Sequence, residues 1–145
     1  MYKKILVPTD GTALSSKAVT AAIEYAGIHR GTRVIGMTVV EPFPLSQLAP
    51  FNSSHETDYL IQERQRAEMR VGEIAELASA AGVPHETVIV ESTRPHEEIV
   101  RVAEEQDCDC IFMASHGRKG LHKLFIGSET KKVLTSTSVP VLVYR

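Results

Sequence analysis

Five short apolar runs alternate with helical segments along this chain, and this alternation restricts the possible folds most strongly. Most of the runs are apolar at consecutive positions, which is typical of strands covered on both faces of a parallel sheet. They cover residues 4–8, 33–40, 86–91, 110–114 and 139–144. Helical periodicity fills the intervals, over residues 14–26, 58–81, 95–106 and 128–137. The order predicts one α/β domain, 1–145: a doubly wound, Rossmann-like five-stranded parallel sheet with helices on both faces.

The longest helical segment and the segment before it carry three further expectations. Gly82 is expected to end the helix 58–81. The segment 41–58 contains three prolines and few charges, so it is predicted as a long loop, either functional or a tolerated surface excursion. The apolar residues of the helix predict a buried face of Leu60, Ala67, Val71, Ile74, Leu77, Ala78 and Ala81.

Composition excludes several classes of protein. No run approaches the roughly 18 to 20 apolar residues of a transmembrane helix. The "ILV" before Pro8 is too short for a secretory signal, so a cytoplasmic protein is expected. A formal net charge of −2 argues against a dedicated nucleic-acid binder, which would show a basic excess.

Three small motifs are interpreted as structural. Cys108 and Cys110 are predicted to be buried strand residues, because no second cysteine pair completes a four-ligand metal site. Ser115 and His116 are adjacent, so their side chains are expected to point apart, and a Ser–His hydrolase is not favoured. The segment "PHEE" (95–98) lacks the i, i+4 spacing of helical metal ligands and is interpreted as helix-start polarity.

The segment 114–134 has the composition of a phosphate cradle. Glycines allow φ > 0 and close approach of N–H groups to a ligand, and Gly127-Ser128 stands directly before a helix, with Ser128 a good N-cap. The alternatives are a simple helix cap and solvated surface charges. No Walker A pattern occurs. The glycines are Gly117, Gly120 and Gly127, and the cations are Arg118, Lys119 and Lys123.

Asp10 is the second candidate, because it follows the first predicted strand. Its carboxylate could bind ribose hydroxyls or help to hold a divalent cation. Equally, Asp10-Gly11 could be a turn into the first helix. The nearby hydroxyl residues, which could reach phosphate or cap that helix, are Thr9, Thr12, Ser15 and Ser16.

The chain resembles the universal stress protein family along its whole length. The resemblance lies in "YKKILVPTDGT", in "RPHEEIVRVAEEQDCDCIFMASHG" and in the final "VLTSTSVPVLVYR". The ATP-binding branch carries G-x-x-G-x₉-G-[ST], and here the four marker positions are Ala114, Gly117, Gly127 and Ser128. Ala114 departs from the pattern; a positive φ there would cost on the order of 1 kcal/mol. Thr38 stands where the family often has a histidine, with no consequence that the sequence reveals.

The resemblance implies a strand order, a ligand and a set of site residues. The order is 3-2-1-4-5, the ligand is ATP or another adenine nucleotide with Mg²⁺ on its phosphates, and Asp10 is a possible metal contact. Val39 would meet adenine through its backbone. The family also implies a homodimer through the last strand, with Val139, Val141 and Val143 at the interface. The implied nucleotide-binding residues are Pro8, Thr9, Asp10, Val39, Met113, Ala114, His116, Gly117, Arg118, Gly127, Ser128 and Glu129.

The predicted function is that of a dimeric, ATP-binding stress-response regulator or partner-binding module. Beyond Asp10 no acid–base pair stands out, so no catalytic residue is assigned and any hydrolysis is expected to be slow. Two alternatives remain open: a nucleotide-independent dimer with a vestigial pocket, and a slow ATPase or nucleotidyl-transfer enzyme on the same fold.

Overall fold

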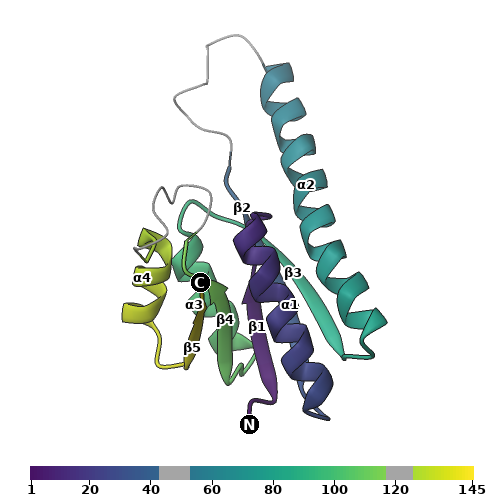
Figure 1. Cartoon of the computed structure of the whole chain (residues 1–145). Helices are drawn as coiled ribbons and strands as arrows, with labels where there is room; N and C mark the ends of the chain where they lie inside the picture. Colours follow the sequence, from purple (N-terminus) through teal and green to yellow (C-terminus); the bar gives the residue numbers. More distant parts are fainter. Residues whose placement is uncertain (43–52, 117–125) are drawn as a thin grey trace.

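The residues that the structure describes form a five-stranded parallel sheet with four helices (Figure 1). The computed structural model describes residues 1–42, 53–116 and 126–145. The strand order is β3-β2-β1-β4-β5, so both the doubly wound fold and the order that the family resemblance implies are confirmed. In chain order the elements are β1 (Lys4–Pro8), α1 (Ala13–Ile28), β2 (Arg33–Val40), α2 (Ser53–Ala80), β3 (His85–Glu91), α3 (Pro95–Glu105), β4 (Cys110–Ala114), α4 (Ser128–Ser136) and β5 (Val141–Tyr144).

Two apolar cores lie on opposite faces of the sheet. On β1, Ile5 and Val7 belong to the core beneath α1 and α2, whereas Leu6 belongs to the core beneath α3 and α4. Successive strand residues point to opposite faces, which is why a continuous apolar run suits a central strand. All three of these side chains are fully buried. The sheet therefore holds both helical layers, and its carboxyl edge is left for the connecting loops.

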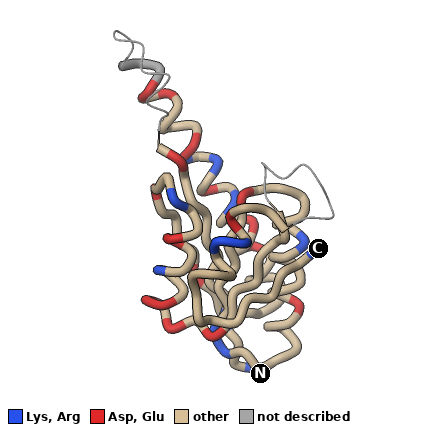
Figure 2. The backbone as a smooth tube through the Cα atoms, turned by 90° about the vertical axis from the view of Figure 1, so that its left-hand side faces the viewer, with Lys and Arg blue, Asp and Glu red and all other residues tan. Residues whose placement is uncertain are grey.

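Helix α2 differs from the prediction at its start and in its buried face. It begins at Ser53, so the predicted loop 41–58 is wrong for residues 53–58, and the rest of that segment from residue 43 lies outside the described residues. Its first turns are polar and carry no apolar periodicity, and they project past the ends of the strands (Figures 1 and 2). The prediction was also wrong for Leu60, Leu77 and Ala81, which are exposed. The buried residues are Glu63, Ala67, Val71, Ile74 and Ala78.

Two glycines set the position of α2. Gly36 lies beneath it on β2, where a Cβ atom would come within 2.8 Å of Ile74 Cγ2, so the helix packs directly on the strand backbone. Gly82 has φ of +66° just past the helix end, and the amide of Val83 donates to Ala78 O at 2.8 Å. The predicted glycine stop is confirmed.

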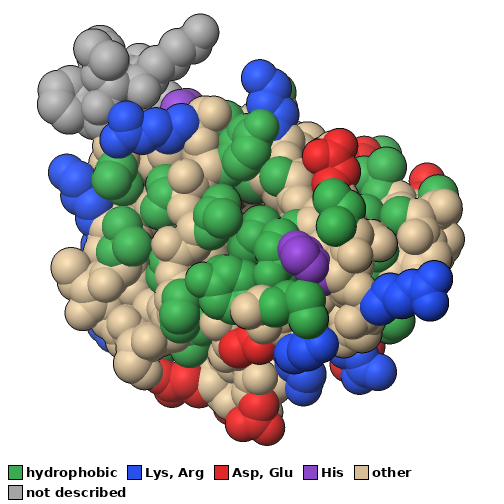
Figure 3. All heavy atoms as spheres, turned by 60° about the horizontal axis from the view of Figure 1, so that its bottom comes forward, with side chains coloured by type: hydrophobic (Ala, Val, Ile, Leu, Met, Phe, Trp, Pro, Cys, Tyr) green, Lys and Arg blue, Asp and Glu red, His purple; other side chains and the backbone are tan. Residues whose placement is uncertain are grey.

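The two edges of the sheet are β3 and β5. Val139 and Val141 pack against the α3/α4 core, while Leu142 is 39% exposed. The predicted dimer contact through this edge stays a prediction. At the amino ends of the strands, hydrophobic side chains gather in the middle of the molecular surface and charged ones lie mostly around its rim (Figure 3). Among the described residues no helix is both long and apolar enough to cross a bilayer.

Candidate functional site

A cavity of about 580 Å³ opens at the carboxyl edge of the sheet, beside β1 and β4, where the strand order reverses. Ten of the twelve predicted nucleotide-binding residues line it, and the other two, Gly117 and Arg118, lie outside the described residues. The structure thus brings these residues together, and their contact with a ligand stays a prediction. The ten are Pro8, Thr9, Asp10, Val39, Met113, Ala114, His116, Gly127, Ser128 and Glu129.

The turn after β1 combines the two roles that the sequence left open for Asp10. Asp10 Oδ1 accepts hydrogen bonds from the backbone N and the Oγ1 of Thr12, at 3.0 and 2.7 Å. Thr12 in turn caps α1 by accepting from the amide of Ser15 at 3.3 Å, and Gly11 has φ of +80°. Asp10 also lines the cavity. It is therefore both the turn residue and a wall of the site.

Thr38 fixes this turn from the neighbouring strand. Its fully buried hydroxyl donates to Thr9 O at 2.8 Å, and the amide of Thr9 donates to Met37 O at 2.8 Å. Hydrogen bonds between buried groups position a backbone firmly, because breaking one leaves a desolvated polar atom. Thr38 thus has a structural consequence that the sequence did not reveal: it holds the end of β1 against β2.

The backbone conformation and the hydrogen bond of Gly127 differ from the prediction. Its φ is −62°, so it needs no left-handed conformation, and its amide donates to Ser115 O at 2.7 Å rather than into the cavity. A Cβ atom at Gly127 would lie 3.1 Å from His116 Cα, so glycine permits the close approach of two backbone segments. Gly127 itself is the N-cap, and the prediction that Ser128 is the cap is wrong because Ser128 is the first helical residue. No side chain in the described chain caps α4.

Ala114 shows no strain at the position where the family pattern has glycine. It is the last residue of β4 and is buried, and Asp107 is the one non-glycine residue with positive φ in the described ranges. The energetic cost expected for a positive φ therefore does not apply. Its carbonyl accepts the hydroxyl of Thr130 at 3.0 Å, which ties the first turn of α4 to the end of β4.

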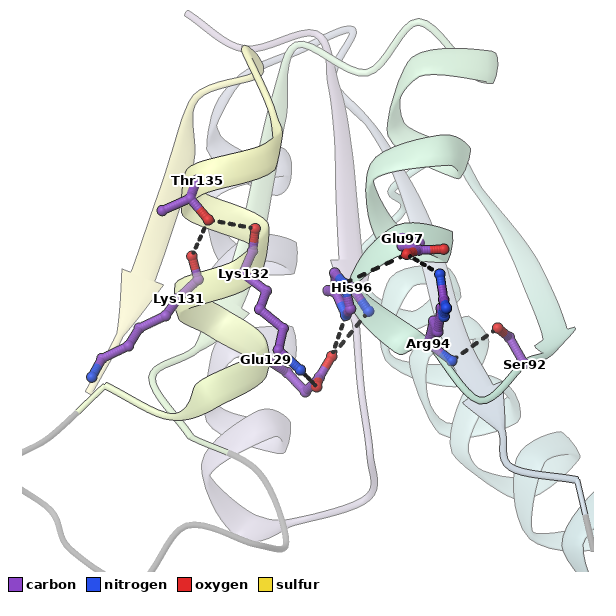
Figure 4. Close-up of polar contacts among 8 residues, drawn as sticks. All are labelled: Ser92, Arg94, His96, Glu97, Glu129, Lys131, Lys132 and Thr135. Atoms are coloured by element: carbon purple, nitrogen blue, oxygen red, sulfur yellow. Dashed lines mark hydrogen bonds and ion pairs between the residues drawn. The ribbon is translucent and has the colours of Figure 1, made fainter. Parts of the chain in front are cut away.

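Glu129 joins the first turns of α3 and α4 (Figure 4). Its Oε2 accepts the backbone N and the Nδ1 of His96, at 3.1 and 2.9 Å, and its Oε1 accepts Lys132 Nζ at 3.1 Å. Burial alone would raise the pKa of Glu129, but the hydrogen bonds from Lys132 and His96 outweigh it and lower that pKa. The "PHEE" interpretation missed this contact, since the partners are 33 residues apart in the sequence.

Several cavity residues were not predicted. Tyr59 and Glu63 come from the first half of α2, inside the predicted helix but outside the segments that directly follow the strands. The Tyr59 hydroxyl donates to Glu41 O at 3.5 Å, and buried Glu63 pairs with Arg66. Positions just after strands could have suggested Glu41 and Thr93. The α3 and α4 side chains Ile99, Thr130 and Lys132 become neighbours only in the fold.

Ser115 and His116 do contact each other, contrary to the expectation that they point apart. Ser115 Oγ lies 3.2 Å from His116 Nδ1, because the chain turns sharply at the end of β4. Ser115 is buried, and within the described ranges no carboxylate bonds the imidazole. The pair therefore lacks the orienting third group of a hydrolase.

Both cysteines are free and buried, as predicted, but only Cys110 is a strand residue, because β4 begins there and Cys108 precedes it; the two belong to different cores. Cys110 packs with the α1/α2 layer and Cys108 with the α3/α4 layer. Burial raises the pKa of the Cys108 thiol to about 11. No group of three or more His, Cys, Asp or Glu side chains in the described ranges could hold a metal ion.

The fold and its cavity define a small doubly wound α/β protein with a ligand-sized site at the switch point. The family model for the universal stress protein family matches residues 1–145, and the chain belongs to this family. It is 35% identical to universal stress protein MJ0531 of Methanocaldococcus jannaschii, over all of this chain and 83% of that one. It is 32% identical to a universal stress protein of Thermus aquaticus over the full length of both.

Solved structures share the fold. The structure of MJ0577 superposes with a TM-score of 0.83 at 28% identity, covering 99% of this chain and 96% of that one. Two more distant structures of universal stress proteins, with TM-scores of 0.72 and 0.67, are complexes with cAMP and, from Archaeoglobus fulgidus, with dAMP. Structural neighbours of this chain therefore bind adenine nucleotides.

Proposed function

We propose that this protein binds ATP, with Mg²⁺, in the cavity at the carboxyl edge of the sheet. The observation that carries the proposal is which helices around that cavity have hydrogen-bond partners for their first backbone amides. Three helices begin there, and the first amides of a helix attract anions when nothing else uses them. The three helix N-termini differ in which groups accept hydrogen bonds from their first amides.

At the starts of α1 and α3, first-turn amides already have hydrogen-bond partners. Thr12 caps α1, as described above. At α3, Pro95 has no N–H group, the amide of His96 donates to Glu129, and the amide of Glu97 donates to Arg94 O at 3.1 Å. By contrast, α4 has no side-chain cap in the described chain, and Ser128 lies on the cavity wall. The phosphates would therefore sit at the first turn of α4.

The remaining walls suit a nucleoside. Apolar side chains offer a slot for a base, and the Asp10 carboxylate lines the same cavity, where it could accept hydrogen bonds from ribose hydroxyls. The apolar lining residues are Pro8, Val39, Pro95, Ile99, Met113 and Ala114. The cavity volume lies within the range of about 300–1,000 Å³ that is usual for small-molecule sites. The complexes of structural neighbours with cAMP and dAMP support an adenine base.

The residues fit Mg²⁺ only as a companion of the phosphates. Asp10 could supply one carboxylate, but the described residues offer no cluster of three ligands. Mg²⁺ characteristically binds through one or two carboxylates, substrate phosphates and water, so such a site needs no protein cage. When bound, the ion would neutralise phosphate charge.

We further propose a cytoplasmic homodimer through the β5 edge, with Val139, Val141 and Val143 at the interface, acting as a nucleotide-responsive regulator or partner-binding module. A hydrolase needs a group that orients the attacking water. Among the described residues we assign none, so turnover is expected to be slow.

The proposal is tested with protein purified from cells. The protein is denatured, released nucleotide is identified by chromatography, and ATP affinity is measured by calorimetry with Mg²⁺. We expect adenine nucleotide to co-purify, and Gly127→Val to abolish binding, because its side chain must displace α4 from His116. Gly27→Val is the matched control, since nothing lies within 4 Å of a Cβ there.

Circular dichroism shows whether Gly127→Val is folded, so that a loss of ATP binding can be distinguished from a loss of folding. If the folded variant keeps undiminished ATP affinity, the phosphate position at α4 is wrong. If the wild-type protein neither carries nucleotide nor binds ATP at millimolar concentration, the nucleotide-independent dimer replaces this proposal. Rapid turnover with Mg²⁺ would favour the enzyme.

A further inference from the structure

The charges of the described residues that line the cavity are unbalanced. Four carboxylates line it, from Asp10, Glu41, Glu63 and Glu129, whereas Lys132 is the one Lys or Arg among the described lining residues. A nucleotide adds the negative charge of its phosphates, and that charge grows with each phosphate. A cation near the phosphates therefore contributes more for ATP than for AMP.

Lys132 is placed to supply this cation. It lies on the second turn of α4, and helical side chains lean toward the helix N-terminus, so its ammonium returns to the level of the first turn. The distance of 3.1 Å between Lys132 Nζ and Glu129 Oε1 fixes it there. The side chain is 52% exposed, so it has room to turn toward the cavity. The ammonium is thus within a side-chain movement of the uncapped amides.

Glu129 can release Lys132 at little cost. Its other oxygen, Oε2, holds both the backbone N and the Nδ1 of His96. The neighbouring side chains at the start of α3 contact each other (Figure 4). Glu97 Oε1 lies 2.9 Å from Arg94 Nη1 and 3.9 Å from His96 Nε2. Glu129 therefore keeps its anchor on α3 when Lys132 departs.

We propose that Lys132 is a specificity-determining residue that exchanges Glu129 for a phosphate oxygen and so favours nucleotides with longer phosphate chains. The exchange is an ion-pair swap and involves no covalent step. His96 acts as a positioning residue, because its backbone N and its Nδ1 keep the released carboxylate bound to α3. This inference rests on the proposed nucleotide site and adds a preference for ATP over AMP.

The test compares AMP, ADP and ATP binding by calorimetry, with Mg²⁺ and with EDTA, for Lys132→Met and Lys131→Met. Lys131 is the matched control: it has the same charge on the next position of α4 but does not line the cavity. We expect Lys132→Met to weaken ATP binding about tenfold, as for one charge-assisted hydrogen bond, and AMP binding by less than about twofold. Lys131→Met should change all three affinities equally and slightly.

A second variant tests the exchange itself. Glu129→Gln keeps an acceptor for His96 but frees Lys132 and removes a negative charge, so ATP affinity should rise by about threefold. An equal loss for AMP and ATP in Lys132→Met, or the same loss in Lys131→Met, overturns the inference. A fall in ATP affinity in Glu129→Gln also contradicts it. If the wild-type protein binds none of the three nucleotides, the proposed function itself fails.

Discussion

Gly36 gives the sharpest test of how the layers pack. A Cβ atom there would lie 2.8 Å from Ile74 Cγ2, 2.9 Å from its Cδ1 and 3.2 Å from its Cβ. Carbon atoms in van der Waals contact are about 3.5–4.0 Å apart, so Ile74 or the whole of α2 must move. Both residues belong to buried surfaces that hold α2 on the sheet. We therefore expect Gly36→Ala to destabilise the fold.

The size of the effect follows from two opposing terms. Overpacking of a core costs about 1–3 kcal/mol. Replacing glycine lowers the entropy of the unfolded chain and returns about 0.4–1 kcal/mol. The free energy of unfolding should therefore fall by about 1–2 kcal/mol. Ile74→Ala alone should cost about 2–5 kcal/mol, as buried large-to-small changes do.

The two substitutions should compensate each other. In Gly36→Ala/Ile74→Ala the new methyl group enters the space that Ile74 leaves, so the double variant should be more stable than the sum of the singles by about 1–2 kcal/mol. Urea unfolding at one fixed protein concentration, followed by circular dichroism, measures all four proteins. Gly72→Ala, with nothing within 4 Å of its Cβ, is the control and should stabilise α2 by about 0.5–1 kcal/mol. The close contact would be refuted if the changes in the free energy of unfolding were strictly additive, or if Gly36→Ala left that free energy unchanged.

Two further predictions concern Ala114 and Cys108. Ala114→Gly should lower the free energy of unfolding by about 1 kcal/mol in urea titration, because the alanine is buried and unstrained; a gain in stability would contradict this. Burial raises the pKa of the Cys108 thiol to about 11, so alkylation of the folded protein at pH 8 should be much slower than that of free cysteine. Since the unfolded chain loses this proton near pH 9 and the folded chain does not, unfolding titrations should show stability falling between pH 9 and 11, and Cys108→Ala should flatten that fall.

The sequence predicted the strands well because their signal is local. Continuous apolar runs located all five to within two residues at either end, and Gly82 marked the end of α2. The order of the strands came from the family resemblance, since no local pattern encodes which strands pair. The start of α2 was missed because its first turns are polar. Its buried face was misjudged because the charged Glu63, which pairs with Arg66, is buried, while the apolar Leu60 is exposed.

The candidate site was predictable only in its position. The rule that ligands lie beyond the carboxyl ends of parallel strands led to the turns after β1 and β4. The hydrogen bonds that decide what those turns do are long-range in sequence. Gly127 reaches back to Ser115, Thr130 to Ala114, and Glu129 to His96. No spacing rule for one helix or loop predicts such partners.

The contact between Glu129 and His96 explains why one helix start differs from its neighbour. If Glu129 did not accept the His96 amide, α3 would also present an unused N–H group beside the cavity, and an anion would have two positions to choose from. Removing the side chain altogether, as in Glu129→Ala, should therefore allow the phosphates to bind at the N-terminus of either α3 or α4. Glu129→Gln keeps the acceptor and changes only the charge. Both variants remove the carboxylate charge and free Lys132, but only Glu129→Gln keeps the acceptor for His96, so ATP affinity should rise less in Glu129→Ala than in Glu129→Gln.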